Sequence, residues 1–150
     1  MAVFHLEFRS ELRVPPAQAW GWITSVEGIL RELRPWMRMT VPRGVARLDD
    51  VAIVPGRPLF RSRLYVLGFI PFGHSDLILL ELNDGKGFVE LSPMTGMKLW
   101  RHERSIEPRG TGCTLTDRLA FEPRFAGRLM ARFVRRTFAH RHAVLRRDLY

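Results

Sequence analysis

Cysteine and lysine are scarce in this sequence of 150 residues, and long apolar stretches are missing altogether. Cys113 is the only cysteine, so the chain cannot form an internal disulfide, and a reducing cytoplasm is the expected location. No segment approaches the roughly 20 consecutive apolar residues that a membrane-spanning helix needs. The first residues alternate apolar and polar side chains, which is typical of a strand and not of a signal peptide.

The charged residues are strongly unbalanced toward the basic side. Arginine and lysine together number 24 against 15 acidic residues, for a net charge of +9, and Lys86 and Lys98 are the only lysines. An anionic partner would explain this excess, and so would the arginine preference of a GC-rich genome. The arginines are spread along the chain without a basic tail or a basic run interleaved with aromatics. Nucleic acid is therefore not expected as a partner, while a transient contact with an anionic membrane remains open.

Length and composition predict one soluble globular domain over residues 1–150, because 46% hydrophobic and 26% charged residues are ordinary for that class. Residues 3–14 alternate as a half-buried strand does. Prolines 15–16 then favour the start of a helix. Gly28 is expected to separate this helix from a second short one, "ILREL", and Pro35 ends the pair.

Strands are expected between residues 36 and 122. Asp84-Gly85 is the strongest turn signal, and a two-residue loop there would place Leu80 opposite Val89 and Ile78 opposite Leu91. The inner face of this hairpin would then carry Ile78, Leu80, Leu82, Val89 and Leu91. The outer face would carry Leu77, Leu79, Glu81, Phe88 and Glu90.

The last segment, residues 121–150, predicts one long amphipathic helix. Its apolar side chains fall within about 200° of arc at 100° per residue. They are Ala126, Leu129, Met130, Phe133, Val134, Phe138, Val144, Leu145 and Leu149. This order of elements predicts an α+β fold in which a curved antiparallel sheet wraps around the C-terminal helix.

The same order resembles the START-related helix-grip superfamily, also called SRPBCC. The segments that carry the resemblance are "VPPAQAWGWITSVEGI", "WRHERSIEPRGTGCTLTDRLAFEP" and "RTFAHRHAVLRRDL". The resemblance covers essentially the whole chain and implies six or seven antiparallel strands gripping the last helix, with two small helices closing one end. It also implies a cavity that binds a hydrophobic small molecule such as a lipid, sterol, polyketide or quinone. Most such single-domain proteins are binders or carriers, and some are cyclases.

Polar residues occupy the predicted inner face of the hairpin over residues 98–122. A four-residue loop would pair Glu107 with Gly112, and this register places His102 opposite Asp117. Directly opposite Cβ atoms lie about 5 Å apart, so the two side chains could share a hydrogen bond. The same register puts Arg104 opposite Leu115 and Trp100 opposite Leu119.

The long helix adds a second polar intrusion. Arg141 falls near the middle of the apolar arc, where an unpaired cation would be costly, so Asp117 is its expected partner. His140 falls at the edge of the arc and His142 on the solvent side. His74 and Asp76 are expected on the inner face of their own strand, where they could extend the cluster.

Three interpretations of the cluster stay open. It could be a structural network of His102, Asp117 and Arg141 that ties the helix to the sheet, or the polar end of a ligand cavity. It could also be a catalytic site in which Asp117 orients His102 as the acid–base group of a cyclase or dehydratase. The residues expected to contact a ligand are Trp100, His102, Arg104, Asp117, Arg141, His74, Asp76, Phe133 and Phe138. No metal site and no cofactor are expected, because the histidines are scattered and His140-x-His142 splits across a helix.

The segment "LGFIPFG", residues 67–73, is apolar and interrupted by glycine and proline. It is the predicted mobile entrance to the cavity. Together with the arginine-rich face of the last helix, it is the predicted point of contact with an anionic membrane.

Overall fold

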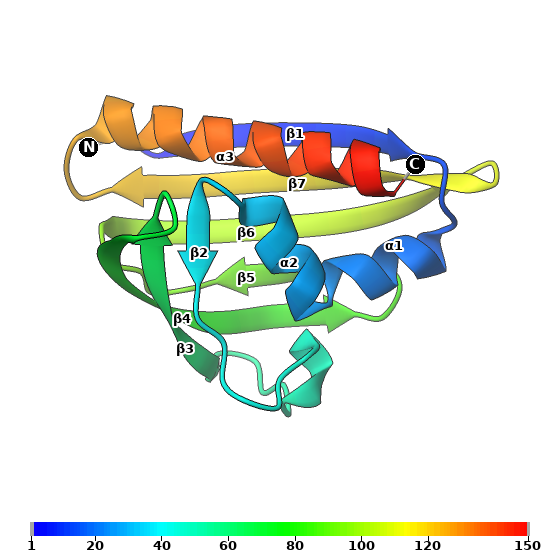
Figure 1. Ribbon diagram of the computed structural model, residues 1–150, viewed down its shortest axis with the longest axis horizontal. Coiled ribbons are helices and arrows are strands. Elements are labelled where there is room, and N and C mark those ends of the chain that lie inside the picture. The colour runs from blue at the N-terminus through cyan, green and yellow to red at the C-terminus, as the bar shows by residue number, and fades with distance from the viewer. Residues whose placement is uncertain (1, 150) are drawn as a thin grey trace.

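The computed structural model describes residues 2–149 and shows seven antiparallel strands in one curved sheet, with a long helix lying along it (Figure 1). The strand order is β1-β7-β6-β5-β4-β3-β2. The elements in chain order are β1 (Phe4–Leu12), α1 (Pro16–Ile23), α2 (Val26–Leu33), β2 (Met37–Met39), the 3-10 turn η1 (Leu48–Asp50), β3 (Pro58–Val66), β4 (Ile70–Asn83), β5 (Gly87–Leu91), β6 (Met97–Arg109), β7 (Gly112–Pro123) and α3 (Gly127–Asp148). The predicted α+β helix-grip arrangement is confirmed.

The two short helices form where expected, but the break between them differs from the prediction. Ser25 caps α2 by accepting a hydrogen bond from the backbone N–H of Gly28 at 3.0 Å. Gly28 therefore lies inside α2 and does not separate the helices. A Cβ atom at this position would lie 2.4 Å from the carbonyl oxygen of Trp22, so glycine is needed for close packing of α1 on α2.

The β6–β7 hairpin has the predicted faces but a register displaced by two residues. Arg109 pairs with Gly112, which leaves a two-residue turn in place of the expected four-residue loop. Gly110 has φ +57° and so accommodates this tight turn. Asp117 consequently lies opposite Arg104, and His102 lies opposite Leu119. A displacement of two keeps every side chain on its predicted face, because side chains alternate with period two.

The β4–β5 hairpin reverses most of its predicted faces. Its loop contains three residues, 84–86, since Asn83 pairs with Gly87, and the register shifts again between Leu79 and Glu81. Both irregularities change which side chains point inward. The cavity side carries Leu77, Leu79, Phe88 and Glu90, and Leu82 packs against the core as predicted. The inward assignment was wrong for Ile78, Leu80, Val89 and Leu91.

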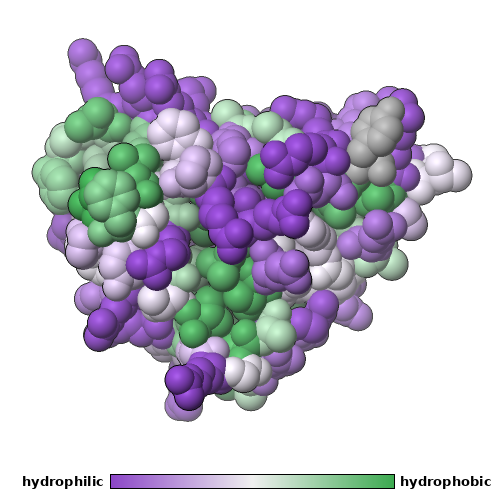
Figure 2. Space-filling view, viewed as in Figure 1, coloured by the Kyte–Doolittle hydropathy of each residue, from purple (hydrophilic) through white to green (hydrophobic). Residues whose placement is uncertain are grey.

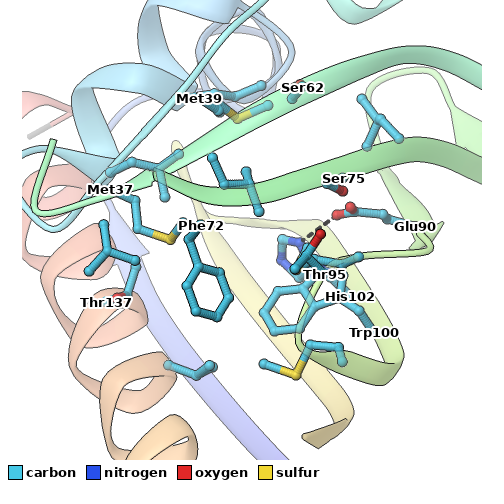
Figure 3. A pocket seen from close by; sticks show the side chains of 18 of the residues that line it. Met37, Met39, Ser62, Phe72, Ser75, Glu90, Thr95, Trp100, His102 and Thr137 are labelled. Carbon is cyan, nitrogen blue, oxygen red and sulfur yellow. Dashed lines mark ion pairs between the residues drawn. The ribbon is translucent and has the colours of Figure 1, made fainter. Parts of the chain in front are cut away.

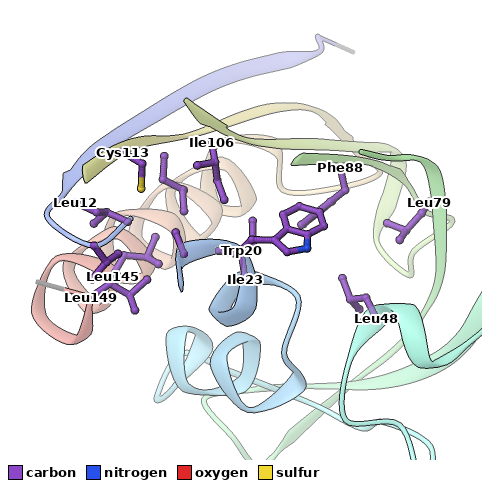
Figure 4. Close-up of a cluster of buried hydrophobic side chains, with 13 residues drawn as sticks. Leu12, Trp20, Ile23, Leu48, Leu79, Phe88, Ile106, Cys113, Leu145 and Leu149 are labelled. Carbon is purple, nitrogen blue, oxygen red and sulfur yellow. The ribbon is translucent and has the colours of Figure 1, made fainter. Parts of the chain in front are cut away.

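The interior is filled at one end and hollow toward the other. The filled end joins α1, the sheet and the C-terminal half of α3, and Figure 4 shows Trp20 and Ile23 of α1 among these side chains. Cys113 is 1% exposed there, as expected of a small core residue. A second apolar cluster lies under the first half of α3. Its buried members are Leu6, Met97, Leu119, Phe121, Val134 and Phe138.

Candidate functional site

A cavity of about 470 Å³ lies between the sheet, α2 and α3 (Figure 3). Most of its lining is apolar and comes from every layer of the fold. The polar side chains in the lining are Ser62, Ser75, Glu90, Thr95, His102, Thr137 and Arg141. A volume of this size suits a drug-sized organic molecule, and a mainly apolar wall with a few polar groups is typical of small-molecule sites.

Below one end of the cavity, Asp117 of β7 is the hub of a buried charged cluster. Its Oδ1 accepts hydrogen bonds from His102 Nε2 at 2.6 Å and from Arg104 Nε at 2.8 Å. Its Oδ2 accepts from Arg104 Nη2 at 2.9 Å and from His142 Nε2 at 2.7 Å. Although burial raises the pKa of this carboxyl, Arg104 and His102 lower it more, so the pKa lies well below its usual range. Asp117 is therefore a carboxylate whose acceptor capacity is fully used.

Glu32 of α2 is the second anionic centre of the cluster. Its Oε1 accepts from Arg104 Nη2 at 2.8 Å and from Arg141 Nε at 3.0 Å. Its Oε2 accepts from Arg104 Nη1 at 3.2 Å and from the indole N–H of Trp22 at 2.9 Å. Burial raises the pKa of Glu32, but Arg104 and Arg141 outweigh that effect and lower it. Arg104 thus joins Glu32 to Asp117 and links α2 to the sheet.

His102 of β6 connects this cluster to the cavity. Its Nε2 donates to Asp117, while its Nδ1 lies 3.5 Å from Glu90 Oε1, an ion pair drawn in Figure 3. Glu90 is fixed in turn by the hydroxyl of Ser92, which donates to its Oε2 at 2.7 Å. Burial lowers the pKa of His102, but Asp117 and Glu90 together raise it above its ordinary value. These contacts favour the protonated imidazolium.

The charges in and below the cavity balance when His102 is protonated. Arg104, Arg141 and His102 then carry three positive charges against the carboxylates of Glu32, Asp117 and Glu90. Each cation has at least one carboxylate within 3.5 Å. A buried cluster of this kind is tolerated because its members compensate one another, and removal of one member would leave an opposite charge unpaired.

His142 links α3 to two neighbouring strands, β7 and β1. Its Nε2 donates to Asp117, and its Nδ1 accepts from the hydroxyl of Ser10 on β1 at 2.7 Å. Ser10 Oγ accepts from Arg146 Nη1 at 2.9 Å, which leaves the hydroxyl proton free to point at His142. These two contacts engage both ring nitrogens of His142, with Nε2 as the donor and Nδ1 as the acceptor.

The structure brings together most of the residues that the sequence singled out. Five of them line the cavity: Trp100, His102, Phe133, Phe138 and Arg141. Arg104 and Asp117 are fully buried next to them. The predicted His102–Asp117 contact is present, but it is diagonal and not directly opposite. The predicted partner of Arg141 was wrong, since Arg141 pairs with Glu32.

Two predicted inner-face residues point away from the cluster. On β4 the cavity side carries Ser75 and Leu77, so the residues between and beside them face outward. Asp76 forms a surface ion pair with Arg61, with Nε 2.7 Å from Oδ1, and His74 is absent from the cavity lining. The inner-face assignment of His74 and Asp76 was wrong, for the same reason as in the β4–β5 hairpin.

Three members of the buried cluster were not predicted from the sequence. Glu90 was placed on the outer face because its hairpin was set in the wrong register. His142 was placed on the solvent side, yet it is 2% exposed because β1 covers that side of α3. Glu32 had no pattern to mark it, although its place beside the buried Leu33 in a short helix was a weak signal.

Residues 2–149 were compared with the requirements of a metal-ligand cluster and of a membrane-spanning helix. They contain no group of three or more His, Cys, Asp or Glu side chains arranged to hold a metal ion. None of their helices combines the length and apolar character that crossing a bilayer requires.

The cavity reaches the surface at a group of exposed apolar residues, here named the apolar rim. Ile70 and Leu129 belong both to the cavity lining and to the exposed surface. Figure 2 shows apolar side chains gathered over the turn between β3 and β4, surrounded by hydrophilic ones. The apolar rim consists of Leu67, Phe69, Ile70, Phe125 and Leu129. The segment predicted as the mobile entrance, residues 67–73, lies at this position, with Ile70 and Phe72 in the cavity lining. Its mobility stays a prediction.

Comparison with solved structures shows the same fold in proteins of very different sequence. The Zhui aromatase/cyclase from Streptomyces sp. R1128 matches with a TM-score of 0.69 at 12% identity, over 99% of this chain and 94% of that one. A START superfamily protein from Mycobacterium smegmatis matches with a TM-score of 0.67 at 16% identity, over 97% and 96% of the two chains. The structure of Ara h 8.0201 matches with a TM-score of 0.58 at 12% identity, over 96% and 98%. These likenesses show the fold alone.

Sequence comparison identifies the family. No curated protein sequence matches this chain. The pattern of a family described as "Domain of unknown function (DUF8410)" matches residues 10–149, which is nearly the whole chain. The chain therefore belongs to the DUF8410 family and has the helix-grip fold of the START-related superfamily.

Proposed function

We propose that this protein, acting as one START-like domain over residues 1–150, binds a hydrophobic small molecule in the cavity between the sheet and α3. The observation that carries the proposal is the cavity of about 470 Å³, whose wall is mainly apolar and which reaches the surface at the apolar rim. An apolar ligand that fills a hollow of this size would gain dispersion contacts with its wall. A lipid, polyketide or quinone-like molecule fits this description, with the protein as carrier or sensor.

Native mass spectrometry of the protein purified from its source cells tests this proposal, and a bound small molecule is the expected result. A matched pair of variants tests the location. Leu77→Trp fills the cavity, whereas Ile78→Trp places the same side chain on the opposite face of β4. We expect Leu77→Trp to abolish the binding of the neutral dye Nile red and Ile78→Trp to retain it. Equal binding by both variants, or an empty wild-type protein, would remove the proposal.

A cyclase- or dehydratase-type enzyme is the second candidate. His102 and Glu90 both line the cavity, 3.5 Å apart, and imidazole and carboxyl groups are common general acids and bases. Both ring nitrogens of His102 already face carboxylates, so Glu90 would be the group nearest a substrate and His102 would hold its proton. Turnover of a candidate substrate at an unchanged rate by both His102→Gln and Glu90→Gln would exclude this role.

Contact with an anionic membrane is a proposed route by which a ligand reaches the cavity. The apolar rim borders the opening, and three exposed arginines adjoin it. Arg38 Nε donates to the carbonyl of Gly68 in the β3–β4 turn at 3.0 Å, and Arg124 and Arg128 are neighbours in sequence of rim residues. Apolar side chains with arginines beside them match the chemistry of an anionic lipid surface.

A further inference from the structure

Ser62 of β3 carries a buried hydroxyl that has no hydrogen-bond partner within residues 2–149. Its side chain lines the cavity, the residue is 1% exposed, and its Oγ has no acceptor or donor among the described residues. Buried polar groups in native proteins are nearly always paired, because an unmade hydrogen bond costs free energy. The hydroxyl of Ser62 is therefore free to hydrogen-bond with a molecule inside the cavity.

Ser75 places a second hydroxyl beside it. The Cα atoms of Ser62 and Ser75 are partners in the β3–β4 register, and both residues line the cavity. Directly opposite side chains on one face of a sheet have Cβ atoms about 5 Å apart, a spacing at which one ligand oxygen can meet both hydroxyls. Their neighbours in the wall are apolar, among them Phe60, Leu64 and Leu77. The two serines thus form a small polar spot in an apolar surface.

The charges around the cavity indicate which oxygen would bind there. The cations of the lining are His102 and Arg141, and each already lies against a carboxylate of the buried cluster. The basic residues beside Ser62 in sequence, Arg61 and Arg63, lie on the other face of β3, where Arg61 pairs with Asp76. A carboxylate at the two serines would lose its hydration without gaining a counter-ion, which is costly. An uncharged hydroxyl or carbonyl oxygen loses much less hydration free energy at this place.

We infer that the ligand of the cavity is an apolar molecule with an uncharged hydroxyl or carbonyl oxygen, and that this oxygen hydrogen-bonds to Ser62 and Ser75. This inference rests on the proposed function, because it names the chemistry of the ligand that the cavity would hold. It assigns the two serines a role in selecting among hydrophobic molecules, which the apolar wall alone does not distinguish.

Displacement of Nile red by three ligands with the same alkyl chain tests the inference: decanol, decanoate and chlorodecane. We expect decanol to bind most tightly. Ser62→Ala should weaken decanol binding by about fivefold to tenfold, as for the loss of one hydrogen bond, and leave chlorodecane binding unchanged. The melting temperature of unliganded Ser62→Ala should equal or exceed that of the wild type, because the variant removes an unpaired buried hydroxyl.

Ser92→Ala is the matched control. Ser92 is also a buried serine, but its hydroxyl is fully used by Glu90 and by the N–H of Ile78, and it lies outside the cavity lining. This variant should lower the melting temperature and keep the preference for decanol.

The outcomes separate the two proposals. Displacement by none of the three ligands would count against the proposed function itself. Equal displacement by all three, unaffected by Ser62→Ala, would leave the proposed function standing and overturn the inference. Tighter binding of decanoate than of decanol would overturn it as well, since Arg141 would then be the group that selects the ligand. A Ser62→Ala variant as destabilised as Ser92→Ala would show that the hydroxyl is already satisfied by internal water, which also overturns the inference.

Discussion

Replacement of Glu32 by glutamine tests whether the buried cluster stabilises the fold as described. Each carboxylate oxygen of Glu32 accepts two hydrogen bonds, from Arg104, Arg141 and Trp22. Glutamine has nearly the same shape, but one oxygen becomes an NH₂ group that faces donors. Arg141 would then lose the carboxylate of its ion pair, and Arg104 would keep only the carboxylate of Asp117.

The expected loss is large. Removal of one partner from a buried ion pair costs about 3–5 kcal/mol, because the opposite charge stays buried and unpaired. For a chain of this length each kcal/mol corresponds to about 2–4 °C in Tm, so Glu32→Gln should lower Tm by roughly 6–20 °C. Against a total stability of about 5–15 kcal/mol, this change could unfold a large part of the population at 37 °C.

Thermal unfolding followed by circular dichroism, with urea unfolding as a second measurement, gives the comparison. Glu27→Gln is the control, because Glu27 lies exposed in the first turn of the same helix, where loss of its charge costs at most about 1 kcal/mol. If Glu32→Gln melts within 2–3 °C of the Glu27→Gln control, the cluster does not hold the helices to the sheet, and the reasoning is refuted.

Two further predictions concern pH and membranes. The lowered pKa values of Glu32 and Asp117 contribute stability above pH 4.5 that is lost as pH falls, whereas the raised pKa of His102 contributes stability below pH 6.5 that is lost as pH rises. Urea midpoints should therefore decline on both sides of that window, and His102→Gln should flatten the alkaline decline; an identical slope in both proteins would contradict this. In vesicle sedimentation, the protein should bind phosphatidylglycerol-containing vesicles and not pure phosphatidylcholine, with about tenfold weaker binding for Phe69→Ser and for Leu129→Ser. The control Leu91→Ser, on the outer face of β5, should bind these vesicles as the wild type does. Equal binding by all three variants and the wild type would exclude the apolar rim as the site of membrane contact.

The fold could be predicted from the sequence because it depends on periodicities that tolerate local error. The apolar faces of β7 and α3 follow periods of two and 3.6 residues over more than ten residues each, so single misplacements do not change the architecture. The His102–Asp117 pair survived a register error of two residues for the same reason. Face assignment failed in β4 and β5, where a bulge and one extra loop residue interrupt the period.

The buried cluster could be predicted only in part, because several of its hydrogen bonds join residues that are far apart in the sequence. Glu32 and Arg104 are 72 residues apart, and Ser10 and His142 are 132 apart. A helical wheel assigns a buried and a solvent side on the assumption that the helix touches one neighbour. α3 is covered by β1 as well as by α2 and β7, so His142 is buried although the wheel places it outside.

The charged contacts of α3 are concentrated in its last two turns. Arg141, His142 and Asp148 fasten that end to Glu32, Asp117 and Arg31. The opposite end begins about 21 Å away at Gly127, at 1.5 Å per residue, beside the opening of the cavity. A tilt of about 5° at the fastened end displaces Gly127 by roughly 2 Å. A displacement of that size would widen the opening by a similar amount, because Leu129, two residues beyond Gly127, lines the cavity at its exposed end.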